Sequence, residues 1–365
     1  HLTDKLGVYK DLITKGLWLE IVLPCVNASD ATFSVSDGKV VYGLGGLKNV
    51  GVEAMRLITT ARGDKAFATL FDFARRVDMK RVGKRPLEML ARAGAFDVLD
   101  RNRSRVFNAL EQLVSYSAAI HEQRASNQVS LFGEAGDDLP EPRLAGVDDW
   151  LPNERLSEEH KAVGFYLSGH PLDDYMVPLK RKGVMTLTEV KRKAEAGACV
   201  VKMCGAVSGK QERKSARGNR FAFAQLSDPT GIYEVTVFSD TLEAARDLLE
   251  AGNNVVLTVE ATMEGEQLKL LARGVQAVDG VAAEAGSMGL KIFVENEAAV
   301  ASVASVLERA IKDGSSRTAG PVVFCLTNAD LPGEVEISLA KDYPVNPQIK
   351  GAIKSLGGVI MVEEC

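Results

Sequence analysis

A glycine-containing turn near the start of the chain has the composition of a phosphate-binding site. It lies in GLGGLKNVGVEAM (43–55), where apolar residues alternate with spaced glycines. Placed between two helices, such a turn points backbone N–H groups outward at a helix N-terminus, where they bind phosphate without reading bases. This arrangement is the helix-hairpin-helix device, and its predicted contact residues are Gly46, Lys48, Asn49 and Gly51.

A second copy of the device is predicted in LARAGAFDVLDRNRSR (90–105). Its turn contains Gly94, and the basic residues that follow are Arg101, Arg103 and Arg105. Between the copies, KRVGKR (80–85) adds Lys80, Arg81, Lys84 and Arg85. Residues 1–120 hold 18 Lys and Arg against 13 Asp and Glu, a net charge of +5. Both turns could be ordinary glycine turns with solvated charges, but their pairing with basic residues favours sequence-independent binding of duplex DNA.

A second basic stretch, GKQERKSARGNR (209–220), is followed by alternating aromatic residues. In an OB-fold, this loop and the adjacent strand face bind single strands through cations and base stacking. The predicted single-strand contacts are Lys210, Arg213, Lys214, Arg217, Arg220, Phe221 and Phe223. Two alternatives remain open: the loop could be merely solvated, and the two phenylalanines could belong to the barrel core.

The stretch SNQVSLFG (126–133) carries an apolar stub between polar and acidic sequence that cannot cover it. Gln128, Leu131 and Phe132 fit the Q-x-x-L-F pattern of peptides that bind the bacterial sliding clamp. Leu and Phe would enter an apolar pocket while Gln anchors the backbone, and a disordered flank would let the peptide reach its partner. The alternative is a minor strand that packs on a neighbouring element of the same chain.

Catalytic and metal-binding patterns are missing from the sequence. It has no paired carboxylates suited to two Mg²⁺ ions, no P-loop and no nucleophile elbow. The five cysteines form no C-x-x-C pair, which disfavours zinc and disulfides and fits a reducing cytoplasm. His170 in SGHPLDDY is predicted to pack or cap rather than to catalyse. We therefore predict no catalytic residue, no metal ligand and no cofactor in this chain.

The elements that would position these residues form a multidomain α+β protein. Residues 1–16 are predicted as a helix, 19–23 as a strand, 31–44 as a hairpin turning at Asp37-Gly38, and about 45–120 as helices. Residues 133–160 hold nine acidic residues against two arginines, a linker composition, and a helix capped by Ser157 follows. Residues 198–278 alternate as five strands, with one helix between the third and the fourth, which is the order of an OB-fold β-barrel. Residues 290–362 follow a βαββαβ order, close to a ferredoxin-like split unit.

Taken together, these parts resemble the C-terminal part of the alpha subunit of bacterial DNA polymerase III, a C-family replicative polymerase. The strings that carry the resemblance are GLKNVG, ARAGAFD, QVSLF and FYLSGHPLD. The resemblance implies six segments: the end of the fingers region (1–34), a tandem helix-hairpin-helix domain (35–120), the clamp-binding peptide with an acidic linker (121–160), a helical connector (161–196), the OB-fold (197–280) and a tau-binding domain (281–365). Relatives often carry two adjacent prolines near 19–26, whereas this chain has Leu23-Pro24.

The resemblance assigns template-directed DNA synthesis to the parent protein rather than to residues of this chain. The metal-binding aspartates and their Mg²⁺ ions are expected in a palm domain that precedes it, and the missing initiator Met suggests a piece of a longer protein. The implied partners are primer–template DNA, the sliding clamp and the tau subunit of the clamp loader, in the cytoplasm and without a membrane. Two alternatives are a stand-alone repair or recombination factor with the same DNA-binding parts, and a protein-interaction scaffold.

Overall fold

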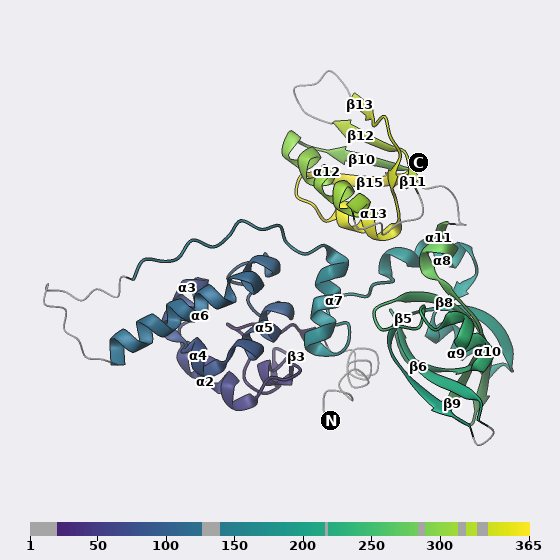
Figure 1. Cartoon of the computed structure of the whole chain (residues 1–365), viewed down its shortest axis with the longest axis horizontal. Helices are drawn as coiled ribbons and strands as arrows, with labels where there is room; N and C mark the ends of the chain where they lie inside the picture. Colours follow the sequence, from purple (N-terminus) through teal and green to yellow (C-terminus); the bar gives the residue numbers. More distant parts are fainter. Residues whose placement is uncertain (1–19, 126–138, 216–217, 284–288, 313–318, 327–334) are drawn as a thin grey trace, which may run out of the picture. The chain divides into compact units, whose positions relative to one another are not determined.

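The computed structural model describes residues 20–125, 139–215, 218–283, 289–312, 319–326 and 335–365 (Figure 1). The chain divides into two units, His1–Ser168 and Gly169–Cys365, which we name the helical unit and the barrel unit. Each unit is described by itself. In the described part of the chain, no helix has both the length and the apolar character that crossing a bilayer requires.

The first described elements of the helical unit form a small three-stranded sheet. Strands β1 (Ile21–Val22), β2 (Ser34–Ser36) and β3 (Lys39–Val41) lie in the order β1-β3-β2, and β2 pairs antiparallel with β3. The turn between β2 and β3 holds Asp37 at φ 51° and Gly38 at φ 73°. Two successive positive φ values are what a type I′ hairpin turn requires, so the predicted hairpin is confirmed.

The described residues of this unit then form six helices and one 3₁₀ turn. They are η2 (Leu44–Gly46), α2 (Val52–Arg62), α3 (Leu70–Arg76), α4 (Met79–Val82), α5 (Lys84–Arg92), α6 (Arg103–Ala125) and α7 (Pro152–Val163). Side-chain caps set two of the starts: Thr69 accepts from the amide of Asp72, and Asp78 accepts from the amide of Arg81. The sequence predicted α7 to start at Ser157, which is wrong. The helix starts at Pro152 because proline suits the first turn and Glu154 accepts the amide of Leu151 at 2.7 Å.

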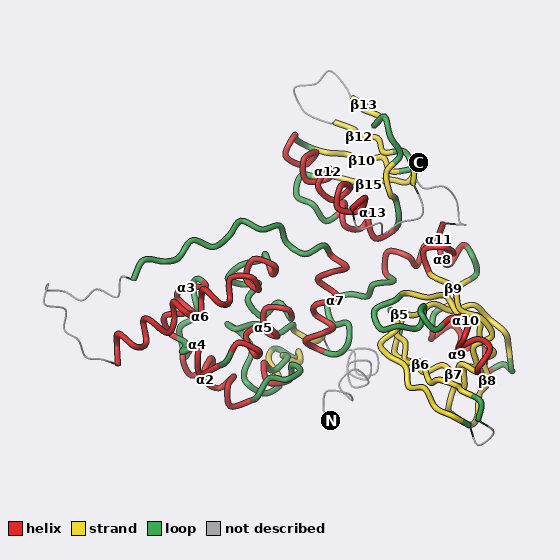
Figure 2. Tube along the Cα trace, in the orientation of Figure 1, coloured by secondary structure: helices red, strands yellow, loops and turns green. Residues whose placement is uncertain are grey.

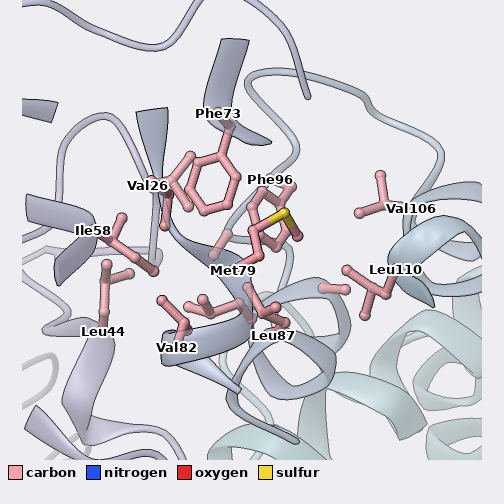
Figure 3. Close-up of a cluster of buried hydrophobic side chains, with 14 of the residues drawn as sticks. Val26, Leu44, Ile58, Phe73, Met79, Val82, Leu87, Phe96, Val106 and Leu110 are labelled. Carbon is pink, nitrogen blue, oxygen red and sulfur yellow. The ribbon is translucent and has the colours of Figure 1, made fainter. Parts of the chain in front are cut away.

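The core of the helical unit joins these helices to the turns between them. Figure 3 shows Met79 and Val82 of α4, Leu87 of α5 and the ring of Phe96 pointing into one cluster. Phe96 lies in the turn after α5, yet it is only 2% exposed and packs edge-to-face on Phe73 at 5.1 Å between centroids. Since α4 and α5 bury these apolar positions, their charged residues must lie on the opposite side of each helix.

The described part of the acidic stretch runs as an extended segment from residue 139 to α7 (Figure 2). Leu139 and Leu144 pack against the core of the helical unit. Glu141 forms an ion pair with Arg75 at 2.6 Å, and the side chain of Asn102 donates to the carbonyl of Val147 at 2.7 Å. Residues 139–151 are therefore attached to the helical unit despite their linker composition.

The barrel unit contains a closed five-stranded barrel. Its strands are β5 (Cys199–Lys214), β6 (Arg220–Asp228), β7 (Gly231–Phe238), β8 (Asn254–Glu264) and β9 (Gln267–Ala277), with α10 (Ser239–Ala245) between β7 and β8. The pairing runs β5-β6-β7-β9-β8 and closes from β8 back to β5. Strands β7 and β9 are parallel and the other neighbours are antiparallel. This strand order confirms the predicted OB-fold.

Short elements precede and follow the barrel. They are η3 (Asp173–Tyr175), α8 (Met176–Arg181), β4 (Val184–Met185), α9 (Leu187–Glu195) and α11 (Val278–Ala283). Val190 and Ala194 of α9 and Leu242 and Ala245 of α10 belong to the same buried cluster as the barrel interior. Both helices therefore cover apolar parts of the barrel.

The last part of the barrel unit follows the predicted βαββαβ order. Its main elements are β10 (Leu290–Val294), α12 (Glu297–Lys312), β12 (Val322–Leu326), β13 (Val335–Ser338), α13 (Pro347–Lys354) and β15 (Val359–Glu364), and β11 (Ala319–Gly320) pairs separately with β14 (Tyr343–Pro344). The sheet order is β13-β12-β10-β15. Strands β10 and β12, joined by α12, pair directly and in parallel. The expectation of a split unit is therefore wrong, because no strand lies between them.

Candidate nucleic-acid interfaces

Four predicted basic residues gather at the turn between α4 and α5. Gly83 forms this turn at φ 95° and precedes the first residue of α5. The first amides of a helix have no partner inside it and carry its positive dipole end, so they favour an anion. The exposed basic residues around this turn are Lys80, Arg81, Lys84 and Arg85.

The cations at this turn are only lightly engaged by carboxylates. Lys80 lies 3.9 Å from Glu122, and Lys84 lies 3.9 Å from Glu111, with all four side chains mostly exposed. Such exposed pairs contribute little and leave the charge available. The guanidinium groups of Arg81 and Arg85 have no partner among the described residues. The turn therefore presents a compact positive surface to solvent.

In the first predicted hairpin, two of the amides expected to bind phosphate are already hydrogen-bonded within the protein. In place of a preceding helix this hairpin has the three-residue turn η2. The amide of Gly46 donates to Gly43, and the amide of Lys48 donates to the carbonyl of Ala162 at 2.7 Å. The prediction that these two amides point outward is therefore wrong. Asn49 and Gly51 remain exposed, with Asn49 at φ 59°.

Two predicted contacts of the second hairpin, Gly94 and Arg103, are buried inside the helical unit. Arg103 is 5% exposed, and its guanidinium donates to both carboxylate oxygens of Asp97, at 2.7–3.0 Å. It also lies 3.8 Å from the buried carboxylate of Glu159. Gly94 is buried at φ 77°, and a Cβ there would overlap this guanidinium. Both predicted contacts are wrong because Gly94 and Arg103 are buried, with the arginine held by Asp97 of the same hairpin and by the distant Glu159.

The two remaining arginines of this hairpin lie at the surface. Arg101 is exposed. Arg105 binds both oxygens of Asp100, at 2.7 and 2.8 Å, which raises the pKa of its guanidinium. The same pair lowers the pKa of Asp100, against the opposing effect of burial. Arg105 is thus engaged by a carboxylate, whereas Arg101 has no side-chain partner among the described residues.

The aromatic residues of β6 lie on the outside of the barrel. Ala222 and Ala224 point inward and are fully buried, so Phe221 and Phe223 face outward and are partly buried. Their rings meet edge-to-face at 5.4 Å. The open choice between core and surface is therefore resolved in favour of the surface.

A third ring, which sequence reasoning missed, completes this face. Phe238 on β7 pairs with Phe221 across the strands, is 54% exposed, and has its centroid 6.4 Å from that of Phe221. Arg213 on β5 pairs with Phe221 and places its guanidinium 5.4 Å from the ring of Phe223. We name Arg213, Phe221, Phe223 and Phe238 the aromatic face. The outward alternation of IYEVTVF contained the signal for Phe238.

The cations of the basic loop next to this face differ in exposure. Lys210 is only 14% exposed and binds Glu250 at 2.7 Å and the carbonyl of Arg246 at 2.9 Å, so it is occupied. Lys214 and Arg220 are exposed near the loop. Arg217 lies outside the described residues. The loop therefore adds two exposed cations to the aromatic face.

Two other predicted features stand apart from these surfaces. Gln128, Leu131 and Phe132 lie outside the described residues, so their clamp contact stays a prediction. His170 is 8% exposed, accepts the amide of Leu172 at 3.1 Å and meets Ser227 at 3.1 Å. These contacts agree with the predicted packing role.

Known proteins similar to this chain point to one family. A family model described as a helix-hairpin-helix motif matches residues 18–106. "DNA polymerase III subunit alpha" of Caulobacter vibrioides is 36% identical over 365 residues, covering 99% of this chain and 31% of the relative. The protein of that name from Pseudomonas aeruginosa is 32% identical over 286 residues, covering 72% of this chain and 24% of the relative. The chain thus spans less than a third of the length of these relatives.

Among solved structures, a mitochondrial single-stranded DNA binding protein from S. cerevisiae, Rim1, is similar to part of the chain. It shares 22% identity over 22% of this chain and 94% of its own length, with a TM-score of 0.20. A TM-score this low adds nothing to the barrel's own strand order, which alone defines the OB-fold here.

Proposed function

Because the chain belongs to the family of bacterial DNA polymerase III alpha subunits, we propose that it is the DNA-holding part of such a subunit. Template-directed DNA synthesis is proposed for the parent protein, whose Mg²⁺ ions we expect on a palm domain rather than on this chain. The proposal also places the parent in the cytoplasm. The observation that supports it best is the aromatic face, which offers three rings and a guanidinium on the outside of an OB barrel.

Single-stranded DNA is the ligand that the aromatic face fits. Bases of any sequence can stack on exposed rings, and a nearby guanidinium attracts the backbone between them. Phe221 and Phe238 stand on neighbouring strands, so two successive bases could each contact one ring. The carboxylate of Glu212 is engaged by Arg246 at 3.3 Å and leaves Arg213 unopposed by it.

Replacing Phe238 with alanine is expected to weaken binding of an oligothymidylate about tenfold, because a stacked base contributes about 1–3 kcal/mol. Fluorescence anisotropy of a labelled oligonucleotide measures this affinity. Ile232→Ala is the matched control, since Ile232 is a 42% exposed outward residue at the other end of the same strand. Equal affinities for the two variants would remove the aromatic face from the proposal, and no binding by the unaltered chain would reject single-strand binding altogether.

Duplex DNA is proposed to bind at the Gly83 turn. The helix N-terminus and the surrounding cations bind phosphate oxygens without reading the sequence. Arg81 and Arg85 are the two cations of this turn with no carboxylate partner among the described residues, and each guanidinium can bind a phosphate through two N–H groups.

The double change Arg81→Ala, Arg85→Ala is expected to flatten the salt dependence of duplex binding. Each lost phosphate contact lowers the slope of log affinity against log salt by about 0.9, so two contacts lower it by about 1.8. Titration of a labelled duplex at several salt concentrations measures the slope. Lys65→Ala removes an exposed cation elsewhere in the helical unit and serves as the control. An unchanged slope in the double variant would place the duplex elsewhere.

Two protein partners belong to the same proposal. Gln128, Leu131 and Phe132 would dock on the sliding clamp, and residues 281–365 would bind the tau subunit of the clamp loader. A clamp tether combined with weak DNA contacts raises the effective concentration of the primer end, because release requires several contacts to break together. Processive synthesis by the parent protein would follow from this combination.

A further inference from the structure

A shallow basic hollow lies where α8, β4 and α9 meet in the barrel unit. Its lining includes Lys180, Val184, Met185, Glu189, Arg192 and Lys193. The lysine comes from the last turn of α8, the two apolar residues form β4, and the other three lie on α9. None of these residues belongs to a motif named above.

The charge of this basic hollow is positive and incompletely balanced. Glu189 is the only acidic residue of the lining, and it lies 3.6 Å from Lys180. The same carboxylate also accepts the amide and hydroxyl of Thr186, at 2.7 and 2.9 Å, as part of the cap of α9. Arg192 and Lys193 are exposed and have no side-chain partner among the residues the structure describes. Two cations therefore face solvent beside an apolar floor.

Strand pairing places the basic hollow in line with β6. On one side of β5, β6 pairs with residues 206–214, and β4 pairs with Lys202 and Met203. The opposite side of β5 is taken by β8 over 199–206, so β4 must follow β6 along the same side. Phe221 pairs with Arg213, and Met185 pairs with Met203, ten residues earlier on β5. That spacing corresponds to about 33 Å of strand.

We propose that the basic hollow binds the phosphate backbone of a single DNA strand whose bases stack on the aromatic face. This inference rests on the proposed single-strand binding. The span between the two sites falls within the stretch that one OB barrel engages, about 4–16 nucleotides. Val184 and Met185 supply an apolar floor for a sugar or base, while Arg192 and Lys193 supply the phosphate contacts.

A single strand of DNA fits the basic hollow better than an acidic peptide does. The hollow lies along the same edge of β5 as β6, which carries two of the three exposed rings, and such rings stack on bases rather than on carboxylate side chains. The sugar–phosphate backbone of DNA also carries a negative charge at every nucleotide. It can therefore contact two cations on α9 and the distant guanidinium of Arg213 at the same time. The acidic peptide remains as an outcome of the test.

The test compares two charge-matched double variants of the chain. Arg192→Gln with Lys193→Gln removes the two cations of the basic hollow. Lys191→Gln with Lys312→Gln removes one exposed cation from α9 outside the lining and one from α12. Anisotropy titrations use a labelled oligothymidylate of about 24 nucleotides, longer than the site of one OB barrel. Thermal unfolding followed by circular dichroism verifies that both variants fold.

The Arg192→Gln, Lys193→Gln variant is expected to bind the oligothymidylate at least about fivefold more weakly. Its slope of log affinity against log salt should fall by about 1.4, which is about 0.7 for each lost single-strand phosphate contact. The control variant keeps the slope of the unaltered chain. Equal behaviour of the two variants, with binding retained, would overturn this inference and leave single-strand binding intact. No binding by the unaltered chain would overturn both. Loss of polyglutamate binding, with DNA binding unchanged, would make the hollow a peptide site and also overturn it.

Discussion

Replacing Arg103 with alanine is expected to lower the unfolding free energy of the helical unit by about 3–5 kcal/mol, the cost of removing one partner from a buried ion pair. Arg103 is 5% exposed and binds Asp97 through both carboxylate oxygens. Its loss would also remove the cation 3.8 Å from the buried carboxylate of Glu159, whose Oε2 already makes no hydrogen bond among the described residues. Most of this loss of unfolding free energy comes from leaving the carboxylates of Asp97 and Glu159 without their cation, and less comes from the lost contacts of the arginine.

Urea denaturation followed by tryptophan fluorescence measures this effect. Trp150 packs on Phe107 of α6, at 5.7 Å between ring centroids, so its emission reports the helical unit, and residues 169–365 contain no tryptophan. Arg101→Ala is the matched control, because this neighbouring arginine is exposed, and its loss should change stability by less than about 0.5 kcal/mol. A stable Arg103→Ala variant with weakened duplex binding would contradict the structural role and restore the predicted DNA contact.

Acidification is expected to destabilise the helical unit through His160. Burial and, secondarily, the nearby charge of Lys48 lower the pKa of His160 from 6.5 to about 4. The ring lies 4.7 Å from that of Tyr166, whose pKa burial raises to about 12. The unfolded chain therefore takes up a proton on His160 between pH 6.5 and 4, while the folded chain does not. The stabilising contribution is complete above pH 6.5 and is lost as the pH falls toward 4, by about 2–3 kcal/mol.

The difference between the unaltered chain and His160→Gln isolates this titration from that of the carboxylates. Urea denaturation at pH 7.5 and pH 4.5 should show the unaltered chain losing more stability than the variant, by most of that amount. Between pH 7 and 8, the two proteins should keep a constant difference, because His160 is neutral in both states. Parallel pH profiles down to pH 4.5 would show that His160 is more open to water than its place beside Tyr166 implies.

The barrel was predictable because its pattern is local and periodic. Alternation along β6 and β7 and the helix after Phe238 define the OB order without knowledge of the rest of the chain. The face of each strand was not predictable for Phe221 and Phe223, because alternation fixes which residues share a face but not which face is inside. Closure of a small barrel decides it in favour of the smaller Ala222 and Ala224, which fit the interior.

The helix-hairpin-helix motif is confirmed over residues 18–106, but its predicted contacts Gly94 and Arg103 are wrong because they are buried. Arg103 forms ion pairs with Asp97 and Glu159, and Arg92 forms one with Glu158 on α7. These arginines are therefore neutralised by carboxylates of the helical unit itself. A net charge of +5 over residues 1–120 therefore overstates the charge available to DNA. The sequence did contain a sign of this pairing, because residues 133–160 carry nine acidic residues and closely follow a basic helical region. Local motifs do not show such pairing.

The chain between the two units is held on both sides of a single residue. The buried carboxylate of Glu159 accepts the amides of Leu167 and Ser168, each at 2.8 Å, and the amide of His170 donates to Asp173 at 2.7 Å. Only Gly169 lies between these fixed points, and a residue offers two soft dihedrals. Rotation in this stretch is therefore concentrated at the two dihedrals of Gly169, the least restricted residue type. A pull along the chain here would act first on the two hydrogen bonds that Glu159 accepts.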